Sequence, residues 1–254
     1  MTKPWLTIYI PTYRGGARLK MLFQSMAESR DDYSDVELLV FDDGSPYADA
    51  YDILNAMELS PVHSSNRRLL RRAENRGILA SVREMLPHAR GLVLLQLDDD
   101  VRVPPGLLPT VDALMSSLSR GTGSSGVGAL SWKSRGTQAG QSEREVPGYL
   151  QPATQLASYC MAFTREAHDA VGGFDARFRT YCGDSDFCLR LTLAGRPCYR
   201  VWWPLVPHDE HGAFKAAPEL DRNATASADL AAFAEKWGAS GAEMEARALA
   251  ALGA

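Results

Sequence analysis

The chain has 254 residues, of which 45% are hydrophobic and 23% are charged, and these values are ordinary for a soluble globular protein. Its formal net charge of −4 argues against a dedicated nucleic-acid-binding protein, because such proteins usually carry a basic face. No apolar stretch approaches the roughly 20 residues needed to span a bilayer, and no secretory leader precedes Trp5. We therefore expect a cytoplasmic protein with reduced cysteines, in which any membrane contact is peripheral and at the inner face.

Strand-length apolar runs alternate with segments of helical apolar spacing along the first half of the chain. We expect strands at 5–10, 36–41, 68–72 and 92–97, and helices at 17–28 and 105–118. Another helix follows the second strand, with Ser45 as its N-cap and Pro46 as its first residue. A further helix follows a turn at 74–77 and ends near 86. This alternation predicts an α/β protein with a parallel sheet that is covered by helices on both faces.

The second half of the chain is less regular. Strands are expected at 127–132, 156–163 and 198–205, a short helix before a Gly172-Gly173 turn, and a helix at 187–194 that opens at 183–186. Residues 119–126 and 135–148 are flexible by composition, so they are either substrate lids or plain surface loops.

Three consecutive carboxylates, Asp98, Asp99 and Asp100, follow the apolar run at 92–97. Unpaired buried charges cost several kcal/mol or more, so the three side chains must lie where the strand leaves the sheet, at its carboxyl end. Adjacent like charges repel one another unless a cation is present, and oxygen ligands suit Mg²⁺ or Mn²⁺. A solvated acidic turn is the alternative interpretation.

A second acidic pair, Asp42 and Asp43, follows the strand at 36–41, so both acidic segments are expected at one edge of the sheet and in one pocket. A divalent cation there would neutralise a diphosphate and stabilise it as a leaving group. Asp42 or Asp43 could accept hydrogen bonds from a ribose or a base.

Asp184 begins a predicted helix, where the helix dipole favours the ionised carboxylate. Such a carboxylate suits a base that takes a proton from a hydroxyl nucleophile. Asp186, two positions on, faces another side of the helix. His208 follows a strand and could complete a metal shell, although a histidine in a loop is more often simply solvated.

In order and spacing these motifs resemble those of family 2 glycosyltransferases of the GT-A fold, over residues 4–214. The motifs that carry the resemblance are Ile10-Pro-Thr-Tyr-Arg14, Phe41-Asp-Asp-Gly-Ser45, Glu74-Asn-Arg-Gly77, Leu97-Asp-Asp-Asp-Val-Arg-Val-Pro104, Gly172-Gly-Phe-Asp175, Gly183-Asp-Ser-Asp-Phe-Cys-Leu-Arg190 and His208. The resemblance implies a Rossmann-like, mostly parallel central sheet flanked by helices. It also implies an inverting transfer from a UDP-, dTDP- or GDP-linked sugar to a hydroxyl acceptor, such as a growing polysaccharide, a lipid-linked glycan, a protein or a small molecule.

The resemblance assigns a role to particular residues of this chain. Residues assigned to the nucleotide and donor are Pro11, Thr12, Tyr13, Arg14, Asp42, Asp43, Asn75, Arg76, Gly77, Asp98 and Asp99. Arg76 is placed near the donor phosphates, and Asp98 near the ribose or the sugar. Asp100 is the direct ligand of Mn²⁺ or Mg²⁺, with His208 as the late histidine of the family and His211 as its competitor. Asp184 matches the catalytic base.

One position departs from the family pattern. Gly183 stands where the family usually has a glutamate before the base, so Asp186 is the fallback base. Two other functions compete with glycosyl transfer. A sugar nucleotidyltransferase would show a Gly-rich, basic loop after the first strand, where this chain has one basic residue in 11–16. A non-catalytic nucleotide-sugar-binding relative would have no need of the base at Asp184.

The chain divides into a glycosyltransferase domain at 1–215 and an Ala-rich helical C-terminal extension at 216–254, with helices near 227–237 and 242–251. In the first of these helices Leu230, Phe233 and Trp237 form an apolar stripe. We expect the extension either to pack on the domain or to mediate self-association as a homo-oligomer, and not to take part in the chemistry. A chain shortened to Lys215 is then expected to keep donor binding.

Overall fold

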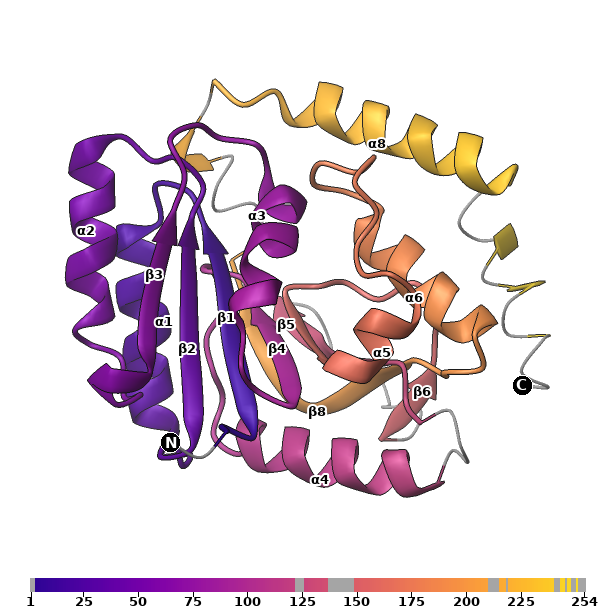
Figure 1. The fold of residues 1–254 in the computed structure, drawn as a ribbon, viewed down its shortest axis with the longest axis horizontal. Coiled ribbons are helices and arrows are strands. Elements are labelled where there is room, and N and C mark those ends of the chain that lie inside the picture. The colour runs from indigo at the N-terminus through magenta and orange to yellow at the C-terminus, as the bar shows by residue number, and fades with distance from the viewer. Residues whose placement is uncertain are drawn as a thin grey trace.

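A computed structural model of the chain describes residues 3–121, 126–136, 149–209, 215–217, 219–239, 243–244, 246–247 and 250. Its centre is an eight-stranded sheet in the order β3-β2-β1-β4-β7-β5-β8-β6 (Figure 1). The strands are β1 (Leu6–Thr12), β2 (Val36–Asp42), β3 (Arg67–Arg71), β4 (Val93–Leu97), β5 (Ala129–Gly136), β6 (Leu150–Pro152), β7 (Cys160–Thr164) and β8 (Tyr199–His208). β1 to β4 are mutually parallel, β7 is antiparallel to β4 and β5, β8 is parallel to β5, and β6 is antiparallel to β8.

Helices cover both faces of this sheet (Figure 1). They are α1 (Gly16–Ser29), α2 (Tyr47–Met57), α3 (Ile78–Met85), α4 (Leu107–Gly121), α5 (Arg165–Ala170), α6 (Gly183–Leu193) and α8 (Arg222–Trp237), with short 3-10 turns η1 (Ser64–Asn66) and η2 (Leu86–His88). The buried side chains of α1, α2 and α4 belong to one core cluster, and those of α3, α5, α6 and α8 belong to the other.

The strand periodicity explains why there are two cores. In β2, Leu38 and Val40 pack in the first cluster, whereas Leu39 and Phe41 pack in the second. Successive side chains of a strand point to opposite faces, so a run that is apolar throughout belongs in a sheet covered on both sides. The predicted α/β architecture is confirmed, with a mostly parallel sheet flanked by helices.

Several local predictions differ from the structure. Ser45 is not the N-cap of α2, because Pro46 occupies that position and the Ser45 hydroxyl donates to Asp42 Oδ1 instead. Strand β6 was not predicted, and the helix expected from Pro105 begins at Leu107. Most of the two segments predicted to be flexible and half of the second predicted C-terminal helix lie outside the described residues. No helix in the described part of the chain has the length and apolar character needed to cross a membrane.

Candidate active site

The acidic segments meet at one edge of the sheet, as predicted. β1 pairs in parallel with both β2 and β4, and Thr12 lies opposite Asp42 in the register. The carboxyl ends of the three strands therefore point the same way, toward a cavity of about 760 Å³. That volume is within the range of pockets that hold small-molecule ligands, and the location is the one at which open α/β sheets bind them.

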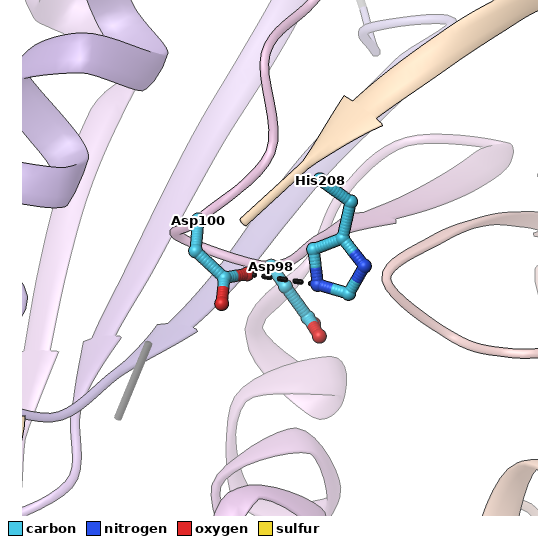
Figure 2. A group of neighbouring side chains, drawn as sticks. All are labelled: Asp98, Asp100 and His208. Atoms are coloured by element: carbon cyan, nitrogen blue, oxygen red, sulfur yellow. Dashed lines mark ion pairs between the residues drawn. The ribbon is translucent and has the colours of Figure 1, made fainter. Parts of the chain in front are cut away.

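Asp98, Asp100 and His208 form a cluster at the edge of this cavity (Figure 2). Their ligand atoms lie within 4.8 Å of one another, and His208 Nε2 is 3.1 Å from Asp100 Oδ1. The end of β8 brings the histidine there, because Arg102 N donates to Pro207 O and Asp209 N donates to Asp100 O. The Tyr159 ring stacks on the imidazole, with 4.5 Å between the ring centroids, and sets its orientation.

The electrostatics of this cluster favour a cation. Burial, followed by repulsion from Asp100, raises the pKa of Asp98 to about 7. A divalent cation would relieve this repulsion, and two carboxylates and one imidazole are a donor set that Mn²⁺ accepts. The residues therefore fit the expected metal. His211, the competing histidine, lies outside the described residues.

Asp99 is directed elsewhere than its two neighbours. Its carboxylate forms an ion pair with Arg18, at 2.8 Å between Oδ1 and Nε, and accepts a hydrogen bond of 2.5 Å from the Thr12 hydroxyl. Both side chains of the pair are largely buried. Asp99 thus connects the end of β4 to the end of β1, and it lines the cavity while its oxygens are engaged by protein groups.

Asp184 lies in the first turn of α6 and lines the same cavity. Its two oxygens accept backbone hydrogen bonds from Ser158 and Ser185, at 3.1 and 2.9 Å, and burial raises its pKa. Asp186 instead lies in an ion cluster beneath the helix with Arg190 and Lys236. Since Asp186 is 0% exposed and does not line the cavity, the geometry favours Asp184 as the base.

The glycine before Asp184 lies in a tightly packed place. A Cβ atom at Gly183 would lie 2.3 Å from Leu79 Cδ1, because α6 begins directly against α3. A glutamate, which the family usually has here, would need this contact to open. The departure from the family pattern therefore lies where the start of α6 packs against the Leu79 side chain of α3.

Most of the residues assigned from the sequence line the cavity, namely Pro11, Thr12, Tyr13, Asp43, Asn75, Gly77, Asp98, Asp99, Asp100, Asp184 and His208. Asp43 also accepts hydrogen bonds from the backbone of Arg76 and Gly77, which holds the 75–77 turn at the cavity.

Arg14, Asp42 and Arg76 were assigned to the donor but do not line the cavity. Arg14 forms an ion pair of 3.1 Å with Glu219, and its backbone N–H donates to the Ser45 hydroxyl. The buried carboxylate of Asp42 accepts from that same hydroxyl and pairs with Arg71. The Arg76 side chain is exposed to solvent.

Several cavity residues were not found by sequence reasoning. Arg179, Thr180 and Tyr181 line the wall just before α6, and no recognisable motif covers them. Residues of the C-terminal extension also line the cavity: Glu219, Leu220, Asp221, Ala224, Thr225 and Ala228.

Helix α8 packs on the domain, one of the two arrangements expected for the extension, and it lies beside α6 (Figure 1). The predicted apolar stripe is corrected at Leu230, which is 60% exposed, whereas Phe233 and Trp237 pack in the second core cluster.

Comparison with known proteins identifies one family that agrees with the motifs of the sequence. The model of the family described as Glycosyl transferase family 2 matches residues 7–170. No curated protein sequence matches the chain.

Three solved structures are among those with a fold similar to that of this chain. The mannosyltransferase PcManGT from Pyrobaculum calidifontis, in complex with GDP-Man and Mn²⁺, shares 18% identity and a TM-score of 0.64, over 84% of this chain and 59% of that one. TarS 1-349 from S. aureus, in complex with UDP-GlcNAc, shares 17% identity and a TM-score of 0.60, over 79% of this chain and 57% of that one. GalNAc-T7 with UDP, GalNAc and Mn²⁺ shares 15% identity and a TM-score of 0.67, over 82% of this chain and 44% of that one.

The chain thus spans less than two thirds of the length of each of these three structures. The likeness concerns the fold, and it confirms the predicted GT-A type.

Proposed function

We propose that this chain, which belongs to glycosyl transferase family 2, moves a sugar from a nucleotide-diphosphate-sugar donor to a hydroxyl group of an acceptor with inversion at the sugar carbon. The observation that carries this proposal is a single cavity lined both by the Asp98, Asp100 and His208 cluster and by the base candidate Asp184. Three structures of similar fold were solved with GDP-Man, with UDP-GlcNAc, or with UDP and GalNAc, which supports a donor of that class.

Asp98, Asp100 and His208 would hold the divalent cation, Mn²⁺ or Mg²⁺. When bound, the cation supplies positive charge that stabilises the departing diphosphate. Burial, and after it repulsion from Asp100, disfavours the ionised form of Asp98, as its raised pKa indicates, so the two carboxylates favour the cation-bound state.

Asp184 acts on the other reactant. Its carboxylate accepts the proton of the acceptor hydroxyl as the new bond between that oxygen and the sugar carbon forms, while the bond from that carbon to the diphosphate oxygen breaks. Burial raises the pKa of Asp184, which makes it a stronger base than an exposed carboxylate. The hydrogen bonds from Ser158 and Ser185 hold the carboxylate in place.

The test is a thermal-shift panel of UDP-, GDP- and dTDP-linked sugars, each measured with Mn²⁺ and with EDTA. A ligand at about 100-fold over its Kd stabilises the protein by about 2.7 kcal/mol, an effect that such a panel resolves. We expect one nucleotide class to stabilise the chain, and only with the cation. Equal stabilisation in EDTA would remove the metal role, and the absence of any stabilisation would overturn the proposal.

A transfer assay with the donor so identified decides between catalysis and binding alone. We expect release of the nucleoside diphosphate to depend on Asp184. A chain that binds the donor with Mn²⁺ but releases no diphosphate with any hydroxyl acceptor would instead be a non-catalytic relative.

A further inference from the structure

Asp229 lies inside helix α8 and is 3% exposed, although the next residue, Leu230, is 60% exposed. Its carboxylate accepts three backbone hydrogen bonds from consecutive residues of one loop: Arg179 N at 3.0 Å, Thr180 N at 2.8 Å and Tyr181 N at 2.7 Å. A buried carboxylate is costly unless such donors satisfy it, and successive backbone N–H groups form a concavity that binds anions. The helix therefore fills this concavity with its own side chain.

The loop held in this way forms a wall of the cavity. Arg179, Thr180 and Tyr181 all line it, and the loop continues through Cys182, in a left-handed conformation with φ 61°, into the turn that carries Asp184. On its other side the Arg179 carbonyl accepts a hydrogen bond from Leu79 N, so the loop is fixed from both directions.

Arg179 is the only lysine or arginine among the cavity-lining residues that the structure describes. The cavity is also lined by several carboxylates, including Asp43 and Glu219, which would repel a diphosphate. The Arg179 guanidinium donates one hydrogen bond, of 3.0 Å, to Asn75 Oδ1 and is otherwise exposed at the cavity. A guanidinium has five N–H donors and binds phosphate oxygens in a bidentate manner.

We propose that Arg179 binds the diphosphate of the donor and that Asp229 is a positioning residue, which holds Arg179 in place through the loop backbone. The C-terminal helix is then required for donor binding, and the expectation that a chain shortened to Lys215 keeps it is reversed. This inference rests on the proposed function, because it takes a nucleoside diphosphate as part of the donor.

The experiment measures the binding of UDP, GDP and dTDP, and of the matching nucleosides, by calorimetry with Mn²⁺ in Arg179→Gln, Asp229→Asn and the double variant. Asparagine keeps the size of Asp229, but its amide nitrogen is itself a donor and cannot accept from the loop. We expect each single variant to bind the diphosphate about 10- to 100-fold more weakly, with little change for the nucleoside. The double variant should be no weaker than the worse single variant, because both changes remove one interaction.

Asp175→Asn is the matched control. Asp175 pairs with Lys236 of α8 at 2.7 Å and accepts a hydrogen bond from Arg177 N, so this change also loosens the helix but leaves the three hydrogen bonds to residues 179–181 intact. If Asp229 merely stabilises the fold, Asp175→Asn and Asp229→Asn should lower the melting temperature and leave diphosphate affinity unchanged. Hydrogen exchange adds a readout that is independent of ligand: the amides of Thr180 and Tyr181 should lose protection in Asp229→Asn and keep it in Asp175→Asn.

The outcomes separate the two levels of the proposal. A wild-type chain that binds a diphosphate no more tightly than Arg179→Gln and Asp229→Asn do would overturn this inference and leave the proposed function standing. Additive losses in the double variant would show that Asp229 does not act through Arg179. A wild-type chain that binds none of the three diphosphates would overturn the proposed function and the diphosphate role of Arg179 together, and hydrogen exchange would still decide whether Asp229 holds the loop.

Discussion

Asp184 and Asp186 are two residues apart in α6, and exchanging each for asparagine should have opposite consequences. Asp184 lines the cavity and accepts backbone hydrogen bonds from Ser158 and Ser185. Asp186 is 0% exposed and faces Arg190, Lys236 and the Trp237 indole N–H. We therefore expect Asp184→Asn to lose turnover and keep stability, and Asp186→Asn to lose stability and keep turnover.

The sizes of the two effects follow from these contacts. General bases contribute roughly 10²–10⁴ in rate, so Asp184→Asn should lose about that factor. Its stability should change by no more than about 1 kcal/mol, because burial already disfavours the charged form and raises its pKa, and the asparagine oxygen can keep a backbone donor. Breaking a buried ion pair costs about 3 kcal/mol or more, which corresponds to roughly 6–12 °C in the melting temperature of a chain of this size.

The assay compares both variants with the wild type below the melting temperature of the weaker variant. Turnover is measured as release of nucleoside diphosphate per folded molecule, and stability by thermal unfolding without ligand. Donor affinity is the control, since neither change removes a metal ligand, and both variants should bind the diphosphate as the wild type does.

Three results would refute the reasoning. Wild-type turnover in Asp184→Asn, with a folded but inactive Asp186→Asn, would move the base by two residues. Normal turnover in both variants would mean that no carboxylate of α6 is the base. A melting temperature of Asp186→Asn within about 1 °C of the wild type would show that the buried ion cluster does not stabilise the fold as described.

Three further predictions concern the cation cluster and the packing of α6. Asp100→Asn should abolish the Mn²⁺-dependent part of diphosphate affinity in calorimetry. Asp99→Asn should mainly lower the melting temperature, because it removes the partner of the largely buried Arg18 side chain. Equal effects of the two variants on affinity would contradict these separate roles. Gly183→Ala should destabilise the fold by about 1–3 kcal/mol in denaturant unfolding, because its Cβ would lie 2.3 Å from a methyl group of the buried Leu79 side chain. An unchanged midpoint would mean that the Leu79 side chain moves aside freely. The pKa of Asp98 is raised to about 7, and its proton must leave before a cation binds. Mn²⁺ affinity measured without nucleotide should therefore fall by up to about tenfold per pH unit below about pH 7. A flat affinity profile between pH 5 and 8 would contradict this prediction.

The outline of the fold and the carboxylates at the end of each strand could be predicted from local pattern. β2 and β4 are mainly apolar apart from Glu37 and Gln96, and aspartates stand at or just after their carboxyl ends. An unpaired charge is least costly where a buried strand leaves the sheet. Parallel pairing then brings these ends to one edge. That is why Asp43, Asp98 and Asp100 were found without a structure.

Local pattern did not show which carboxylates of the two acidic segments are held by other protein groups. Asp42 and Asp99 are engaged by Arg71 and Arg18, and both arginines come from other elements. Whether a carboxylate meets a ligand or an arginine depends on the elements that pack beside it. That information lies in contacts between residues far apart in sequence.

The C-terminal helix shows most clearly what only the tertiary structure decides. By helical pattern Leu230 should be buried and Asp229 should be exposed, yet the reverse holds, because three N–H groups from a loop almost fifty residues earlier satisfy the carboxylate. Burial of a polar side chain depends on where its donors lie in space, and no periodicity in the helix itself records them. For the same reason Arg179, which belongs to no motif, lies in the wall of the cavity.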